Sequence, residues 1–294
     1  MDLRAILMGL GFVLMWSSAF ATAKIIVADA PPLMSLAARF LITGLIAVAL
    51  ARAMGQDWRL PGGLRGAQAR AVLIFGLCQN ALYLGLNFVA MQWIDGSLAA
   101  IIASAMPLIV AALGWAFLGE RTSALGILGL VTGMGGVLLI MGTRLSGGAD
   151  ALGVALCIAG ALALAVATLS VRGASGGGNL LMIVGLQMLV GAGALGAVSA
   201  LIETPEMVVS TRWILAFVYQ CLVPGLAATL VWFALVGRIG AVRAATFHFL
   251  NPAFGVAIAA LLLGERLSLW DGIGVAVAAL GILAVQLSRT LPRA

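Results

Sequence analysis

Residues 107–136 read PLIVAALGWAFLGERTSALGILGLVTGMGG, and residues 252–281 read PAFGVAIAALLLGERLSLWDGIGVAVAALG. The two stretches align without a gap at a separation of 145 positions. The residues that recur are Pro107, Gly119-Glu120-Arg121, Ser123, Gly129 and Gly136 in the first stretch, and Pro252, Gly264-Glu265-Arg266, Ser268, Gly274 and Gly281 in the second. The chain therefore contains an internal repeat.

This repeat lies within a very apolar chain. Of its 294 residues, 63% are apolar and 9% are charged, whereas soluble domains hold about 45–50% apolar and about 25% charged residues. The composition predicts an integral membrane protein with no sizeable soluble domain. Breaks at charges, prolines and glycine clusters predict ten transmembrane helices, at residues 5–27, 33–53, 71–91, 97–118, 123–143, 151–171, 179–201, 213–236, 242–263 and 269–288. The first run resembles a signal peptide, but it is long enough to span and we interpret it as a helix.

The predicted helices divide equally between two repeats, residues 1–145 and residues 146–294, within one membrane domain. Because each half holds five helices, an odd number, equivalent helices run through the membrane in opposite directions. Inverted halves are typical of transporters, since they can open a central site to alternate sides. We therefore predict an all-α fold with two inverted five-helix repeats.

The charges predict the orientation of this fold. The longest joint, residues 54–70, is rich in arginine, as is typical of a cytoplasmic loop. With both termini on that side, most of the 16 Lys and Arg residues are cytoplasmic. Topology thus explains the net charge of +6, and nucleic acid is not an expected partner. The excess of Arg over Lys indicates a GC-rich bacterial genome, so we expect the cytoplasmic (inner) membrane of a bacterium.

The two stretches resemble paired EamA repeats of the drug/metabolite transporter superfamily. Residues Trp16-Ser17-Ser18-Ala19-Phe20 and Lys24 agree with the first helix of that family, and Pro32 and Arg39-Phe40 agree with the second. The resemblance implies a membrane exporter of amino acids or similar small metabolites. Aromatic amino-acid exporters of the YddG type offer the nearest analogy.

Polar side chains inside the predicted spans are candidate substrate contacts, because polar groups are costly in hydrocarbon and face either a wet cavity or another helix. On the third span, Gln79, Tyr83 and Asn87 recur one turn apart and form a polar stripe. Hydrogen bonding between helices is the alternative for these residues. The predicted substrate-binding residues are Trp16, Ser17, Gln79, Asn80, Tyr83, Asn87, Trp232, His248 and Asn251.

Three prolines mark predicted hinges. Pro252 follows His248 and Asn251, and its missing N–H leaves the carbonyl of His248 without its helical partner, which predicts a polar notch. Pro107 and Pro224 are expected to break their helices in the same way. The alternatives are a neutral histidine satisfied by a neighbouring helix, and kinks that serve packing without motion.

Charge is nearly absent from the membrane interior. No Asp or Glu falls deep within a predicted span, although carboxylates are the usual ion relays of coupled carriers. We therefore expect a facilitative exporter of neutral or zwitterionic solutes, with a proton-coupled multidrug or metabolite exporter using His248 as the alternative. Arg39 lies inside the second span. We interpret it as reaching the membrane surface or bonding carbonyls, and carboxylate binding is its other possible role.

Other classes of protein have weaker support. Residues Gly173–Gly177 match the G-x-S-x-G pattern of serine hydrolases, but they lie in a predicted glycine-rich joint, so we do not expect an enzyme. The three cysteines lie in apolar runs without metal-ligand spacing, and we expect no metal or cofactor. Gly129 and Gly133 suit close helix packing, either within the chain or between copies of a channel or scaffold. We expect a monomer.

Overall fold

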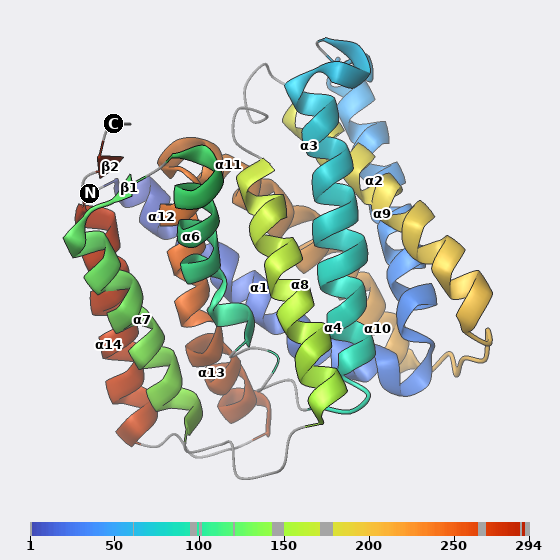
Figure 1. Cartoon of the computed structure of the whole chain (residues 1–294). Coiled ribbons are helices and arrows are strands. Elements are labelled where there is room, and N and C mark those ends of the chain that lie inside the picture. Colours follow the sequence, from blue (N-terminus) through green and yellow to red (C-terminus); the bar gives the residue numbers. More distant parts are fainter. Residues whose placement is uncertain are drawn as a thin grey trace.

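The computed structural model describes the whole chain except residues 1, 61, 95–98, 100–101, 120, 143–149, 171–178, 264–268, 289 and 292–294 (Figure 1). The helices are α1 (Leu3–Asp29), α2 (Pro32–Ala53), η1 (Gly63–Arg65), α3 (Ala67–Phe75), η2 (Gly76–Leu84), α4 (Gly85–Ala90), α6 (Met106–Leu118), α7 (Ala124–Gly142), α8 (Ala151–Ser170), α9 (Leu180–Ile202), α10 (Thr211–Gln220), η3 (Cys221–Ala227), α11 (Ala228–Ile239), α12 (Ala241–Ala245), η4 (Thr246–Leu250), α13 (Asn251–Leu263) and α14 (Leu269–Leu287). The predicted repeat boundary, Glu120, Glu265 and residues 173–177 lie outside the described residues.

Most described helices of this bundle lie within a few residues of a predicted span, but the span predicted at residues 97–118 is described as helix only from Ile102 to Leu118. Six helical segments are long and apolar enough to cross a membrane, and three further apolar helices in the described part are shorter. The sequence did not predict one small feature, a pair of two-residue strands. These strands, β1 (Arg121–Thr122) and β2 (Thr290–Leu291), are antiparallel and pair Arg121 with Leu291.

The outer surface of the bundle is apolar. Large apolar side chains such as Leu45, Phe117, Leu128 and Leu201 are 54–85% exposed. A soluble monomer rarely exposes so much contiguous apolar surface. The polar side chains predicted to contact substrate are instead buried at the centre. The bundle therefore has the inverse polarity of a soluble protein, as a lipid-embedded chain requires.

At one edge of the bundle, α7 and α14 lie side by side (Figure 1) and are packed through glycines. A Cβ added at Gly129 would lie 2.7 Å from the carbonyl oxygen of Gly281, and one at Gly136 would lie 2.6 Å from that of Gly274. Since the residue numbers rise along one helix and fall along the other, the two helices are antiparallel. Small residues let the two backbones touch, and contact of this kind stabilises helix pairs in lipid.

At the opposite edge, α2 packs against α9 (Figure 1), and polar groups add to this contact. The carboxylate of Glu203, which follows α9, accepts hydrogen bonds from the backbone N–H groups of Leu33 and Met34, both at 2.8 Å. These two N–H groups belong to the first turn of α2 and have no partner within the helix. Glu203 therefore caps α2 from a distant part of the chain.

Three of the predicted continuous helices change their geometry partway. The third span is α-helical in α3, π-helical in η2 and α-helical again in α4, and the eighth repeats this pattern in α10, η3 and α11. The ninth passes from α12 through the 3-10 helix η4 into α13. A π-helical turn is rare and often marks a functional site. All three breaks lie in segments that carry predicted site residues.

The ends of the described chain lie at one end of the bundle (Figure 1). Asp2 caps α1 by accepting hydrogen bonds from the N–H groups of Arg4 and Ala5, and its carboxylate also pairs with Arg238 at the end of α11. Nearby, β2 pairs with β1. These contacts hold the N-terminal end of α1 in place. The middle of α1 packs against the irregular segments η3 and η4.

Candidate functional site

The predicted polar notch around His248 forms at the centre of the bundle. Asn251 donates a hydrogen bond from its amide nitrogen to Nδ1 of His248, at 2.9 Å. The hydroxyl of Ser17, on α1, lies 3.3 Å from both oxygens of Asn251. Pro252 cannot bond the carbonyl of His248, which accepts instead from the N–H of Asn251 and from the hydroxyl of Ser104, at 3.2 Å. The structure thus brings together Ser17 of the first helix and His248 and Asn251 of the ninth, which the sequence named separately as candidate substrate contacts.

Aromatic rings surround His248. The rings of Phe12 and Trp232 lie with centroids 5.3 and 5.2 Å from the imidazole, and that of Trp16 lies at 6.0 Å, all edge-on to it. Each of these three side chains is at least 93% buried, since Trp16 is the most exposed at 7%. The predicted mid-span tryptophans therefore lie beside the histidine and do not anchor the protein at the membrane surface.

A small cavity opens beside this cluster. Its volume is about 10 Å³, which is near the minimum for one water molecule. His248 Nε2 and Gln79 Oε1 are both buried there without a hydrogen-bond partner among the described residues. Because Nδ1 accepts from Asn251, the neutral ring carries its proton on Nε2, which leaves an unpaired donor facing the same space as an unpaired acceptor. The residues that line the cavity are Phe12, Trp16, Phe75, Gln79, Leu164, Thr229, Trp232 and His248.

The predicted polar stripe of the third span is divided by the π-helix η2. Gln79 lines the cavity beside His248, whereas Tyr83 and Asn87 line a second cavity. Asn80 lines neither cavity and bonds Gln187 on α9, through the backbone oxygen at 3.1 Å and through the side-chain oxygen. One stripe thus reaches two cavities and one neighbouring helix.

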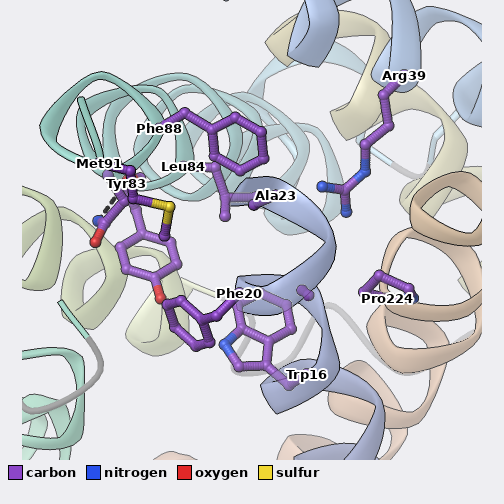
Figure 2. A pocket seen from close by; sticks show the side chains of 11 residues that line it. Trp16, Phe20, Ala23, Arg39, Tyr83, Leu84, Phe88, Met91 and Pro224 are labelled. Atoms are coloured by element: carbon purple, nitrogen blue, oxygen red, sulfur yellow. Dashed lines mark hydrogen bonds between the residues drawn. The ribbon is translucent and has the colours of Figure 1, made fainter. Parts of the chain in front are cut away.

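The second cavity lies on the other side of Trp16 and has a volume of about 20 Å³ (Figure 2). Trp16 lines both cavities and stacks on Tyr83, with ring centroids 6.2 Å apart and planes 9° from parallel. The amide of Asn87 is satisfied, since it donates to the carbonyl of Tyr83 and accepts from Cys157. The other residues that line this cavity are Ala19, Phe20, Ala23, Arg39, Leu84, Phe88, Met91 and Pro224.

Arg39 is a charged cavity residue that the sequence interpretation did not place among the substrate contacts. Its side chain is 3% exposed and extends from α2 toward Pro224 (Figure 2), so the expectation that it reaches the membrane surface is wrong. Its position inside the second span was the available signal, but that position alone does not tell which way the side chain points. Beyond the cavity, a surface hollow of about 470 Å³ begins one helical turn further along α1, at Val27 and Asp29.

The three predicted hinge prolines all lie where helix geometry changes. Pro107 and Pro252 occupy the first turn of α6 and of α13, where a missing N–H breaks no helical bond. Pro224 lies inside η3. The matching break at η2 contains no proline, and the repeat offered a signal for it, because Gln79 and Gly76 lie 145 positions before Pro224 and Cys221.

A helical bundle with apolar outer faces and a buried polar centre defines a multi-pass membrane protein with an internal site. The family model of EamA-like transporters matches residues 3–142 and 151–287, and the chain belongs to this EamA-like transporter family. It is therefore a membrane transporter, not an enzyme, with a small-molecule substrate.

One relative agrees with this assignment, and one solved structure has the same fold. A Bacillus subtilis (strain 168) protein described as the uncharacterized transporter YvbV is 26% identical over 261 residues, which cover 87% of this chain and 83% of the relative. A crystal structure of another protein, 22% identical, matches with a TM-score of 0.78 over 96% of each chain. That second likeness concerns the fold alone.

Proposed function

We propose that this protein exports amino acids or similar neutral or zwitterionic metabolites from the bacterial cytoplasm, down their gradient, by alternating access between two inverted five-helix halves. Aromatic amino acids are the preferred candidates. The observation that carries the proposal is the central pair of unpaired polar atoms, His248 Nε2 and Gln79 Oε1. A buried donor or acceptor without a partner is costly, and a ligand with both donors and acceptors satisfies both atoms.

Reciprocal contacts support the inverted halves. Gly129 and Gly136 of α7 correspond, 145 positions later, to Gly274 and Gly281 of α14. Gly129 contacts Gly281, and Gly136 contacts Gly274, so each residue meets the counterpart of the other. Contacts of this kind are expected across a two-fold axis. The π-helices η2 and η3 also begin 145 positions apart, at Gly76 and Cys221.

Alternating access requires the central side chains to separate. Both central cavities are too small for an amino acid, since their volumes are about 10 and 20 Å³. Trp16 lines both cavities, so neither side of the tryptophan has room for substrate in this conformation. The irregular segments η2, η3 and η4 border the cavities, and such segments can change geometry at lower cost than a regular helix.

We further propose an inner-membrane monomer with both termini in the cytoplasm. The arginine-rich joint between α2 and α3 gives the orientation. The predicted packing glycines Gly129 and Gly133 are covered within the chain, by Gly281 and by the ring of Phe249. They are therefore not needed for contact with a second copy.

Counterflow in proteoliposomes tests the proposal. Vesicles are preloaded with one of a panel of unlabelled amino acids, and uptake of the same labelled amino acid is measured. A carrier is accelerated by substrate on the opposite side, whereas a channel is not and a scaffold gives no flux. We expect stimulation for aromatic amino acids, and we expect Tyr83→Ala and Trp232→Ala to change the order of preference. Unchanged selectivity in both variants contradicts their place in the site.

His248 favours one second candidate, a proton-coupled exporter. It is the only histidine of the chain and lies beside the central cavity, where protonation would add a charge next to bound substrate. An imposed proton gradient distinguishes the two mechanisms. A facilitative carrier gives no uphill flux, whereas a coupled carrier that uses His248 gives uphill flux that His248→Ala abolishes.

A further inference from the structure

Among the described residues, the buried guanidinium group of Arg39 has no counter-ion. Its Nε atom has no hydrogen-bond partner, and within the described part of the chain no ion pair or hydrogen bond reaches the group. The ring of the adjacent Phe40 lies 5.0 Å below it. A ring face interacts favourably with a cation but supplies neither the charge nor the in-plane acceptors of a carboxylate. The described part of the chain therefore leaves this cation uncompensated.

The surroundings of Arg39 define what can compensate it. The guanidinium faces the cavity beside Trp16, together with the apolar side chains of Phe20, Phe88 and Met91 (Figure 2). Of the described residues that line this cavity, none carries a carboxylate, and the single amide among them, on Asn87, is already satisfied. The cavity thus offers a planar cation at one end and an aromatic, apolar wall along the rest. Guanidinium groups pair best with carboxylates, through two parallel hydrogen bonds.

We propose that Arg39 binds the carboxylate of the transported solute, and that this cavity selects small carboxylates with an apolar or aromatic side chain. The inference rests on the proposed function and adds the group by which the solute is held. It excludes amines and amides of the same shape, which the pair His248 and Gln79 alone would accept. The carboxylate also neutralises the buried charge, so solute binding stabilises the site electrostatically.

The position of Arg39 also connects binding with the broken helix. Its Nε lies 3.6 Å from the place where a Cβ on Gly225 would be, and the hydroxyl of Thr43, one turn further along α2, lies 3.4 Å from the carbonyl of Cys221. Both neighbours belong to the π-helix η3. A carboxylate on Arg39 therefore lies against the segment that we expect to bend.

Calorimetric titration of the purified full chain tests the subsite without relying on transport. The probes are L-phenylalanine, 3-phenylpropionate, L-phenylalaninamide and 2-phenylethylamine, which differ in their carboxylate and amine groups. We expect the two carboxylates to bind about tenfold or more tightly than the amide and the amine, as charge-assisted pairs require. Equal affinity for phenylalanine and its amide overturns the proposal, as does the absence of binding by all four probes.

Substitution of Arg39 tests whether this side chain causes the preference for carboxylates. In Arg39→Gln, we expect the affinity for phenylalanine to fall to that for its amide, while the affinity for the amide stays the same. Arg39→Lys is expected to keep part of the preference, since it keeps the charge without the fork. Arg70→Gln, which removes an exposed arginine, serves as the matched control. A full carboxylate preference in Arg39→Gln overturns the proposal. If that variant does not fold, Arg39→Lys and the probe series on the parent chain still decide.

Counterflow with the same probes separates this inference from the proposed function. Equal counterflow of phenylalanine and phenylalaninamide supports a carrier and overturns the carboxylate subsite. Selective binding of carboxylates without counterflow of any solute supports the subsite and overturns the carrier.

Discussion

The edge formed by α7 and α14 and the centre around Trp16 are built on opposite principles. At the edge, glycines bring two backbones into contact, and the interface needs no polar partner. At the centre, cavities remain on both sides of Trp16, and the buried groups Arg39 Nε, Gln79 Oε1 and His248 Nε2 lack partners among the described residues. Close packing supports stability, whereas unpaired polar groups reduce it.

Because of this difference, the centre is the part of the protein that departs from its most stable arrangement. Functional sites commonly keep polar groups that weaken the fold, because the ligand needs them. Changes at the edge are therefore expected to lower stability, and changes at the centre are expected to lower transport.

The largest effect is expected at the edge, for Gly281→Ala. The new methyl group would overlap the backbone nitrogen of Gly133 and lie 2.6 Å from the carbonyl oxygen of Gly129. Backbone atoms cannot move aside without separating the helices, so the free energy of unfolding should fall by about 1–3 kcal/mol. Thermal unfolding of the purified protein in detergent measures the change.

Gly135→Ala is the matched control for this substitution. Gly135 lies on α7, and a Cβ added there meets no atom within 4 Å. Alanine also favours a helix over glycine by about 1 kcal/mol, so the melting temperature should not fall. If both variants unfold at the same temperature, the close contact between α7 and α14 does not contribute to stability as argued.

The next prediction concerns the centre, where Gln79→Met replaces an amide by an apolar side chain of similar length. The substitution removes an unpaired buried acceptor, so the melting temperature should stay the same or rise. Counterflow should fall about tenfold, the loss expected when a ligand gives up one good hydrogen bond. Lower stability with undiminished counterflow would mean that Gln79 supports the fold and does not contact substrate.

The sequence predicted the positions of the helices well, because apolar runs of membrane length are strong signals. It also predicted a polar notch at His248 and Asn251, since the effect of Pro252 on a helix is local and known, but it did not predict that Ser17 of α1 joins them. It did not predict how the stripe on the third span divides. A π-helix changes the direction of every later side chain, and no proline marks η2.

The direction of the Arg39 side chain could not be predicted from the sequence for a different reason. A long side chain six residues inside a span can reach the surface or turn inward, and the outcome depends on which helices cover it. Here α2 is covered by α9 and lies against η3, so the surface is closed to the guanidinium. Packing between distant parts of the chain determines the direction of the Arg39 side chain, and this packing cannot be inferred from one sequence.

The two edges of the bundle differ in how they pack, because the α2–α9 edge uses polar contacts whereas the α7–α14 edge uses glycines. Glu203→Ala removes both hydrogen bonds to the first turn of α2, and the loss of a helix cap costs about 1 kcal/mol. The melting temperature should fall by less than in Gly281→Ala. Glu206→Ala, at an exposed position three residues later, is the control and should unfold like the parent.

The smallest effect is expected for Asp2, which caps the N-terminal end of α1, away from the central site. The hydrogen bond from Arg238 holds the pKa of the Asp2 carboxyl below its usual range. Because the folded-state pKa lies below the unfolded one, the carboxylate stabilises the fold fully above about pH 4, and this contribution is lost as the pH falls through the folded value. Asp2→Asn should therefore melt slightly below the parent at pH 7, and the gap should close in acid. Arg238→Gln should give the same gap, and the double variant should add little to either, because both changes remove one contact. A gap that persists in acid would assign the effect of Asp2→Asn to a cause other than this pair.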